Sequence, residues 1–211
     1  MPVSPLDLTP RSAGHWDQRY REGSDRWELG RAAPPLETFL RTDVRAPQPA
    51  GPVLVPGCGR GHEAALLADL GHSVVALDFS AEAIERGQER HGAVRPRLRW
   101  LQADLLDAGA LDAAGLTSGS LWGVLEHTCF CAIDPDRRAA YLETVVRLLA
   151  PGGWLVGLFW CHRRPGGPPW GSDPEELAQQ VAAAGLRRQL WEPARGSAPE
   201  RDNEWLGLWW R

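Results

Sequence analysis

The residues best suited to chemistry begin with a glycine-rich run, Gly57-Cys58-Gly59-Arg60-Gly61, which follows the apolar stretch 53–55. Glycine has no Cβ, so such a run lets the backbone approach a bound ligand closely. About 20 residues further on, a second apolar stretch ends at Asp78, whose carboxylate can accept hydrogen bonds from a ribose diol. An apolar strand, a glycine turn and an acid at this spacing predict a binding site for a nucleoside cofactor.

The spacing of the glycines separates two classes of cofactor. The dinucleotide fingerprint G-x-G-x-x-G would require a third glycine at the position of His62. The run here is G-x-G-x-G, through Gly57, Gly59 and Gly61, a form commoner in methyltransferases, where no pyrophosphate must be bound. The turn therefore favours S-adenosylmethionine. An NAD site and a purely structural turn are the alternatives.

Cysteine and histidine residues near the middle of the chain suggest two further chemistries. Cys129 and Cys131 follow Glu126 and His127, but zinc sites usually need a second, distant pair of ligands, and the sequence offers none. Alternation along a strand would also direct neighbouring side chains to opposite faces. Cys161 with His127 is a conceivable catalytic pair, without any signature of a hydrolase. We expect no metal.

The stretches around these residues predict the elements that must position them. From residue 51 onward, short apolar runs alternate with amphipathic stretches, as in a parallel sheet with crossover helices. The predicted strands are 52–56, 73–78, 98–103, 121–126 and 153–161. The predicted helices are 62–70, 81–91, 135–149 and 174–184, with a shorter helical piece at 14–22. Two last strands, 186–191 and 204–210, have no helix between them and predict an antiparallel hairpin at the sheet edge.

Length and composition limit the organisation and the partners of the chain. Its 211 residues suit one α/β domain, with a polar, proline-rich leader at 1–50 and a body at 51–211. The net charge is −4 and the arginines are scattered, which argues against nucleic acid as a partner. No apolar run approaches the ~20 residues of a membrane span, and residues 1–10 lack an export signal. We therefore expect a cytoplasmic protein with a small-molecule substrate and no membrane partner. The sequence does not indicate an oligomeric state.

Three stretches together resemble the thiopurine S-methyltransferase-like family, which includes the plant thiol and halide methyltransferases. They are the glycine run at 56–61, the run Glu126-His127-Thr128-Cys129-Phe130-Cys131-Ala132-Ile133, and Gly166-Gly167-Pro168-Pro169-Trp170. The resemblance runs from about residue 16 to 177. It implies S-adenosyl-L-methionine as cofactor and a Rossmann-like α/β fold with a mostly parallel seven-stranded sheet, flanking helices and an N-terminal helical lid.

Residue by residue, the resemblance implies a set of cofactor contacts. They are Trp16, Tyr20, Trp27, Gly57, Gly59, Asp78, Asp104, Leu105 and His127. Aromatic faces suit a sulfonium, because a cation within ~6 Å of a ring gains ~0.5–2 kcal/mol. Asp104 follows the third strand, where it can accept a hydrogen bond from an adenine amino group. The alternatives are a hydrophobic stripe for Trp16 and Tyr20 and a turn or N-cap role for Asp104.

The chain departs from the family pattern on the side of the methyl acceptor. His127 stands where relatives carry tyrosine or arginine, and the stretch 160–164 is more basic and aromatic than in relatives. We expect in-line methyl transfer to a small soft nucleophile, either a thiol, a halide or a metalloid oxyanion. His127 is the candidate catalytic base for a thiol, titrating near 6.5, or else a cofactor contact. The rival functions are an NAD-linked oxidoreductase and a non-catalytic module that binds a nucleoside cofactor.

Overall fold

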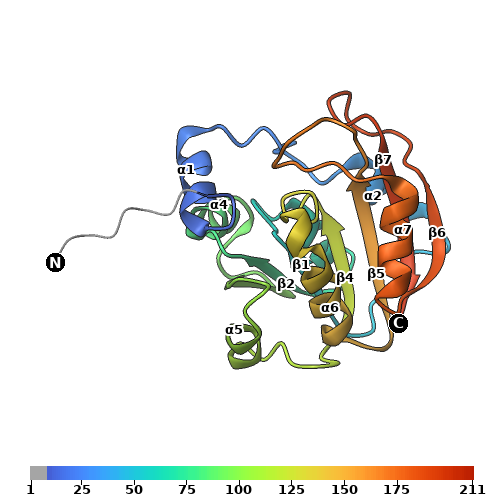
Figure 1. The fold of residues 1–211 in the computed structure, drawn as a ribbon. Helices are drawn as coiled ribbons and strands as arrows, with labels where there is room; N and C mark the ends of the chain where they lie inside the picture. The colour runs from blue at the N-terminus through green and yellow to red at the C-terminus, as the bar shows by residue number, and fades with distance from the viewer. Residues whose placement is uncertain (1–8) are drawn as a thin grey trace.

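A seven-stranded sheet forms the centre of the computed structural model, which describes residues 9–211 (Figure 1). The strands lie in the order β3-β2-β1-β4-β5-β7-β6. Their bounds are β1 Pro52–Pro56, β2 Ser73–Asp78, β3 Leu98–Gln102, β4 Leu121–His127, β5 Leu149–Trp160, β6 Arg187–Pro193 and β7 Glu204–Trp210. Strands β1 to β5 pair parallel, whereas β7 pairs antiparallel with both β5 and β6. The sheet is therefore mixed, and the predicted hairpin is confirmed.

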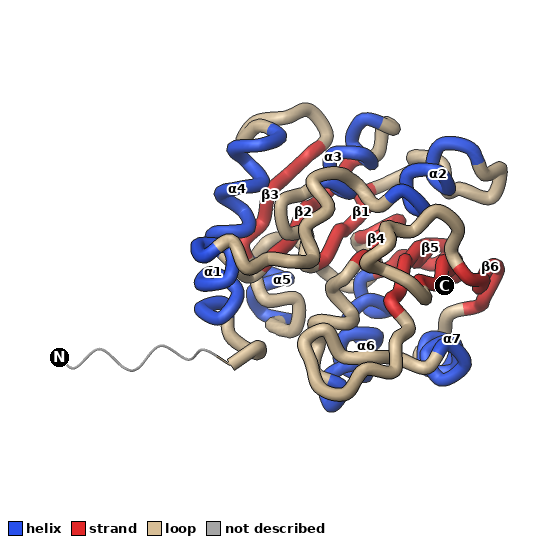
Figure 2. Tube along the Cα trace, turned by 90° about the horizontal axis from the view of Figure 1, so that it is seen from above, coloured by secondary structure: helices blue, strands red, loops and turns tan. Residues whose placement is uncertain are grey.

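Helices cover both faces of this sheet (Figure 2). One face is covered by α2 and α3, which bury Leu36 and Leu67 against it. The other face is covered by α5 and α7, which bury Leu111 and Val181. The helices are α1 Ala13–Glu22, α2 Pro34–Thr42, α3 His62–Asp69, α4 Ala81–His91, α5 Ala108–Ala113, α6 Arg138–Leu148 and α7 Pro174–Ala183, with a 3₁₀ turn, η1, at Pro135–Arg137. Because both faces are covered, the central strands β1 and β4 are mostly apolar and buried, whereas the edge strand β3 carries Arg99 and Gln102 and is partly exposed.

The sequence did not predict α2, which lies in the stretch assigned to the leader. Its signals are local: prolines occupy its first turn, and Leu36, Phe39 and Leu40 are buried at helical spacing. The short helix α5 was missed as well, although Asp107 caps its N-terminus. Strand β5 begins at Leu149, before Pro151 and Gly152, where the sequence predicted only the end of a helix.

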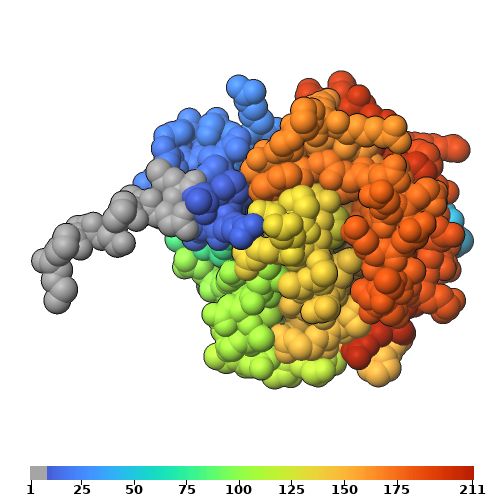
Figure 3. Space-filling model, viewed as in Figure 1, coloured from blue at the N-terminus to red at the C-terminus, as the bar shows by residue number. Residues whose placement is uncertain are grey.

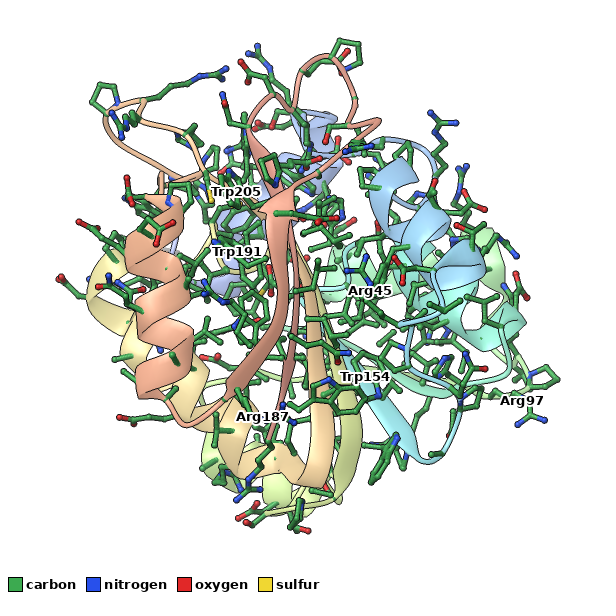
Figure 4. All side chains as sticks on the ribbon, turned by 90° about the vertical axis from the view of Figure 1, so that its right-hand side faces the viewer. Arg45, Arg97, Trp154, Arg187, Trp191 and Trp205 are labelled. Carbon is green, nitrogen blue, oxygen red and sulfur yellow. The ribbon has the colours of Figure 1, made fainter. Side chains whose placement is uncertain are left out.

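Tryptophans fix the C-terminal half of the sheet from both sides (Figure 4). Trp154 of β5 is fully buried in the core beneath α2 and α3. On the opposite face, Trp191 of β6 and Trp205 of β7 pack with their ring centroids 5.2 Å apart. This packing holds the β6–β7 hairpin, whose connecting loop, 194–203, returns to the edge of the sheet described next.

The carboxyl ends of the parallel strands meet at one edge of the sheet. The glycine turn follows β1, Asp78 ends β2, Asp104 follows β3, and His127 ends β4. Leader residues between 10 and 34, the loop after β5 and the β6–β7 loop lie at this same end (Figure 1). Open α/β sheets bind ligands at this edge. The topology therefore brings the predicted residues together.

No helix in residues 9–211 is long and apolar enough to cross a membrane. The expectation that no export signal is present rests on residues 1–10, and all but the last two lie outside the described residues.

Candidate functional site

A cavity of about 1110 Å³ opens at the carboxyl edge of the sheet. The leader and the loops after β5 and β6 extend along this side of the molecule (Figure 3). The residues expected at the site all line the cavity: Trp16, Tyr20, Trp27, Gly57, Gly59, Asp78, Asp104, Leu105 and His127. Residues as far apart in sequence as 16 and 127 thus line one cavity.

The glycine turn is packed so closely that side chains are excluded. Gly57 has φ +54°, and a Cβ there would lie 2.8 Å from Cys129 Sγ. Gly59 has φ +52°, and a Cβ there would lie 2.9 Å from the Tyr20 hydroxyl. Both positions require the left-handed backbone that favours glycine. The turn therefore leaves bare backbone facing the cavity directly before α3, which suits a nucleoside cofactor.

Asp78 is buried beneath this turn, with 6% of its surface exposed. One carboxylate oxygen accepts from Gly59 N at 3.0 Å and the other from Ser80 N at 2.9 Å. Burial raises the pKa of Asp78 from 3.8 to about 6, despite these two hydrogen bonds. A buried carboxylate of this kind gains from further donors, and the hydroxyls of a ribose would supply them.

Asp104 and Leu105 complete the wall after β3. Asp104 Oδ1 accepts from Leu106 N at 2.8 Å, which fixes the carboxylate in a local turn, and Leu105 is buried. Asp104 therefore has the turn role considered from sequence and also lines the cavity.

The three leader aromatics pack against one another at the rim of the cavity. Trp27 lies edge-on to Trp16 at 5.2 Å and to Tyr20 at 5.6 Å between ring centroids. Trp27 Nε1 donates to the Tyr20 hydroxyl at 3.3 Å. The three rings pack against one another and all line the cavity, and their contact with a cofactor stays a prediction.

No local signal in the sequence indicates how the leader is attached to the body. Asp17 accepts from Ser80 Oγ at 2.6 Å and from Glu82 N at 3.2 Å, so a leader carboxylate caps the first turn of α4. Further along, Glu28 accepts from His62 Nε2 at 2.7 Å. These contacts join the leader to the two helices that follow β1 and β2.

His127 occupies the wall at the end of β4, with 9% of its surface exposed. Its Nδ1 lies 2.9 Å from Glu63 Oε1 and its Nε2 lies 3.9 Å from Glu204 Oε1. Burial alone would lower the pKa of His127, but the carboxylates of Glu63 and, to a lesser extent, Glu204 outweigh burial and the pKa rises to about 9. Burial would likewise raise the pKa of Glu63, but His127 lowers it to about 2. At neutral pH the pair is an imidazolium and a carboxylate, not the neutral imidazole with a pKa near 6.5 that the sequence suggested.

Arg201 is a further cavity residue that the sequence did not single out. Only 4% of it is exposed; it donates to the Trp27 carbonyl and lies 3.8 Å from Glu204 Oε1. Its guanidinium also lies 5.8 Å from the ring of Trp160, and that of Arg164 lies 5.2 Å from the same ring. The part of the cavity lining around Trp160 is thus aromatic and cationic.

Cysteines line the cavity without being activated. Burial raises the pKa of Cys58 and Cys129 well above 9.0, and that of Cys131 to about 12. These side chains are neutral thiols at physiological pH. They form an apolar lining and do not supply a nucleophile.

Comparisons with known proteins identify a family for this arrangement. The family model "Thiopurine S-methyltransferase (TPMT)" matches residues 11–204. A probable thiol methyltransferase 2 of Arabidopsis thaliana is 28% identical over 96% of this chain and 87% of its own length. Thiocyanate methyltransferase 1 of the same plant is 28% identical over 93% and 84%. A thiopurine S-methyltransferase of Pseudomonas putida is 28% identical over 79% and 81%.

The fold has solved counterparts at lower identity. The 1,6-didemethyltoxoflavin-N1-methyltransferase of Burkholderia thailandensis, solved with S-adenosylhomocysteine, matches with a TM-score of 0.73 and 21% identity, over 100% of this chain and 92% of the other. A TehB-like methyltransferase of Corynebacterium glutamicum matches with a TM-score of 0.62 and 19% identity, over 95% and 98%. The Rossmann-like fold of such methyltransferases is therefore confirmed for this chain.

Proposed function

This chain belongs to the thiopurine S-methyltransferase family and is an S-adenosylmethionine-dependent methyltransferase, and we propose that its acceptor is a small, soft nucleophile that reacts as an anion. The candidates are thiolates, halides and metalloid oxyanions. The names of the thiol and thiocyanate methyltransferase relatives support this class. Because the chain belongs to this family, the two rival functions, an NAD-linked oxidoreductase and a non-catalytic module, are excluded.

We assign the cofactor to the glycine-turn end of the cavity. S-Adenosylmethionine, when bound, supplies a methyl group on a positively charged sulfur, which is a good leaving group. Asp78 accepts from the ribose hydroxyls, and Gly57 and Gly59 allow close approach of the backbone. Asp104 with Leu105 holds the adenine. The cluster of Trp16, Tyr20 and Trp27 covers the cofactor and stabilises its positive charge.

We place the acceptor in the same cavity, on the part of its lining that His127 and Arg201 form. The observation that carries this proposal is that His127 lines the cavity beside Arg201 with a buried Nε2 that has no hydrogen-bond partner among residues 9–211. The raised pKa of His127, caused by Glu63, favours a positive charge at this position. A cation there attracts an anionic nucleophile and holds it in line with the methyl group, and the low dielectric strengthens the attraction. Trp160 and Trp170 line the same cavity and exclude water from the nucleophile.

A base role for His127 receives less support. A group that is already protonated at pH 7 cannot accept a proton from a thiol, and its pKa of about 9 lies well above the 6.5 expected of a base here. As a cation, His127 instead favours the thiolate over the thiol. The role as a base and the role as a cation therefore predict different effects of a His127 substitution on thiol and iodide methylation.

The variant His127→Gln tests the proposal. Iodide carries no proton, so loss of a base would leave its methylation nearly unchanged, whereas loss of a cation should lower kcat/KM for iodide about 10- to 100-fold. We expect kcat/KM for an aliphatic thiol to fall as well, with the affinity for S-adenosylhomocysteine retained. Unchanged iodide methylation together with a thiol rate lowered ~10²-fold would restore the base role. Equal loss of both acceptors with weakened cofactor binding would make His127 a cofactor contact.

A further inference from the structure

One oxygen of a buried glutamate is shared by the acceptor wall and the leader. Glu63 Oε1 lies 2.9 Å from His127 Nδ1 and accepts from Ala33 N, also at 2.9 Å. Glu63 is buried in the first turn of α3, directly behind the glycine turn. Ala33 lies where the leader enters α2. A single carboxylate therefore joins α3, the end of β4 and the leader.

Charged groups surround His127 on its other side as well. Glu204, at the start of β7, presents Oε1 to His127 Nε2 at 3.9 Å and to Arg201 Nη1 at 3.8 Å. Arg201 in turn donates to the carbonyl of Trp27 in the leader. The remaining charged neighbour is Glu126, the preceding residue of β4. Because Nδ1 is closest to a carboxylate, Glu63 makes the strongest of these interactions.

The second ring nitrogen shows that the imidazole is oriented from the Glu63 side. His127 Nε2 is buried and has no hydrogen-bond partner among residues 9–211, since 3.9 Å to Glu204 is too long. An unpaired buried donor is costly and rare. Glu63 is therefore the one hydrogen-bonded anchor of the ring within the described residues.

We propose that Glu63 is a positioning residue for methyl transfer, holding His127 as an imidazolium on the acceptor wall and fixing the leader at Ala33 through the same oxygen. The proposal rests on the acceptor role proposed above for His127. Glu63 lines the cavity together with His127, and the role proposed for it is exerted through that imidazole. It acts by deciding the charge and orientation of His127.

The variant Glu63→Gln separates the charge of Glu63 from its hydrogen bonds. The amide oxygen can still accept from Ala33 N, but the negative charge is lost. We expect the titration midpoint of His127, followed by NMR of its ring carbon and proton, to fall by roughly 1–3 units from about 9. Glu28→Gln is the matched control: it alters another Glu–His pair, Glu28 with His62, and should leave the midpoint of His127 unchanged.

The pH profile connects this titration to catalysis. In the wild type, kcat/KM for iodide should decline as His127 loses its proton near pH 9. A fall of two units in the midpoint would lower the protonated fraction at pH 8.5 by about 25-fold, and the rate with it. The decline should move to lower pH in Glu63→Gln by the amount seen in the NMR titration. A residue that only supports the fold would lower the rate without moving the profile.

Hydrogen exchange tests the leader contact. In Glu63→Ala the Ala33 amide loses its acceptor and should exchange faster, whereas in Glu63→Gln its protection should persist. Equal protection of Ala33 in wild type and Glu63→Ala would contradict the leader part of the proposal.

Two results would overturn the claim that Glu63 holds His127 as an imidazolium. The first is a wild-type His127 midpoint near 6.5, which can be measured even if the variants do not fold. The second is a folded Glu63→Gln protein whose midpoint stays near 9. A shifted midpoint with an unshifted iodide profile would overturn the link to transfer and identify the acceptor role of His127 as the failing premise.

Discussion

Because the fold buries Asp78, we expect ionisation of its carboxyl group to be less favourable than that of an exposed aspartate. Its pKa is raised from 3.8 to about 6. The neutral acid is therefore favoured in the folded state, and the associated stability is present below pH 3.8 and lost as the pH rises through 6. In Asp78→Asn this position no longer titrates. The variant should accordingly gain stability relative to the wild type as the pH rises.

The size of this gain follows from the two pKa values. Between pH 5 and pH 7.5, linkage gives a relative gain of about 1.4 kcal/mol for the variant. The absolute difference at one pH also contains the changed hydrogen bonds to Gly59 and Ser80, which cost about 1–3 kcal/mol where an amide N–H replaces an accepting oxygen. The pH-dependent part is free of that cost. The pH-dependent difference in the free energy of unfolding therefore measures the cost of burying the Asp78 charge.

Urea unfolding of both proteins at pH 5 and pH 7.5, without cofactor, measures this gain. Calorimetry with S-adenosylhomocysteine at pH 7.5 should show binding weaker by roughly 1–3 kcal/mol in the variant, because the ribose loses a charged acceptor. Wild-type affinity should also decrease below pH 6, whereas that of the variant should not follow this titration. Stabilities that change in parallel with pH, together with equal affinities, would refute the role given to Asp78.

Two further predictions concern the glycine turn and the leader. Gly57→Ala should abolish detectable cofactor binding, because its Cβ meets Cys129 Sγ at 2.8 Å; Gly115→Ala, also at positive φ but with no atom within 4 Å, should retain binding. Normal cofactor affinity in Gly57→Ala would exclude a close approach of the cofactor to the backbone of the glycine turn. If the aromatic cluster covers the cofactor as we propose, the leader should exchange its amide hydrogens more slowly across residues 10–30 when S-adenosylhomocysteine is bound. Equal protection with and without the ligand would contradict a lid.

The fold could be predicted largely because its elements carry local signals. Strands β1, β2 and β7 and helix α4 have the predicted bounds, since each is an apolar or amphipathic run between clear stop signals. The cavity lining was predictable for a different reason. The carboxyl ends of parallel strands must meet, so Gly57, Asp78, Asp104 and His127 had to converge once the strands were identified.

Long-range partners could not be predicted from the same signals. Glu63 and Arg201 are ordinary charged residues in their own segments. Nothing local indicates that Glu63 contacts His127, or that Arg201 and His127 both approach Glu204. The protonation state of His127 depends on those partners and on burial, which is why the sequence suggested an ordinary imidazole. Helix α2 had readable signals, but the surrounding prolines and polar residues favoured a loop.

The most direct test of the central claim is a transfer assay with S-adenosylmethionine carrying a labelled methyl group. The acceptors are iodide, thiocyanate, an aliphatic thiol, selenite, tellurite and arsenite, and Asp78→Ala serves as the cofactor-binding control. We predict labelled methyl product from at least one of these soft nucleophiles in the wild type, reduced in the control in proportion to its weaker cofactor binding. A protein that binds S-adenosylhomocysteine, methylates none of them, and instead methylates an amine or hydroxyl acceptor would contradict the account.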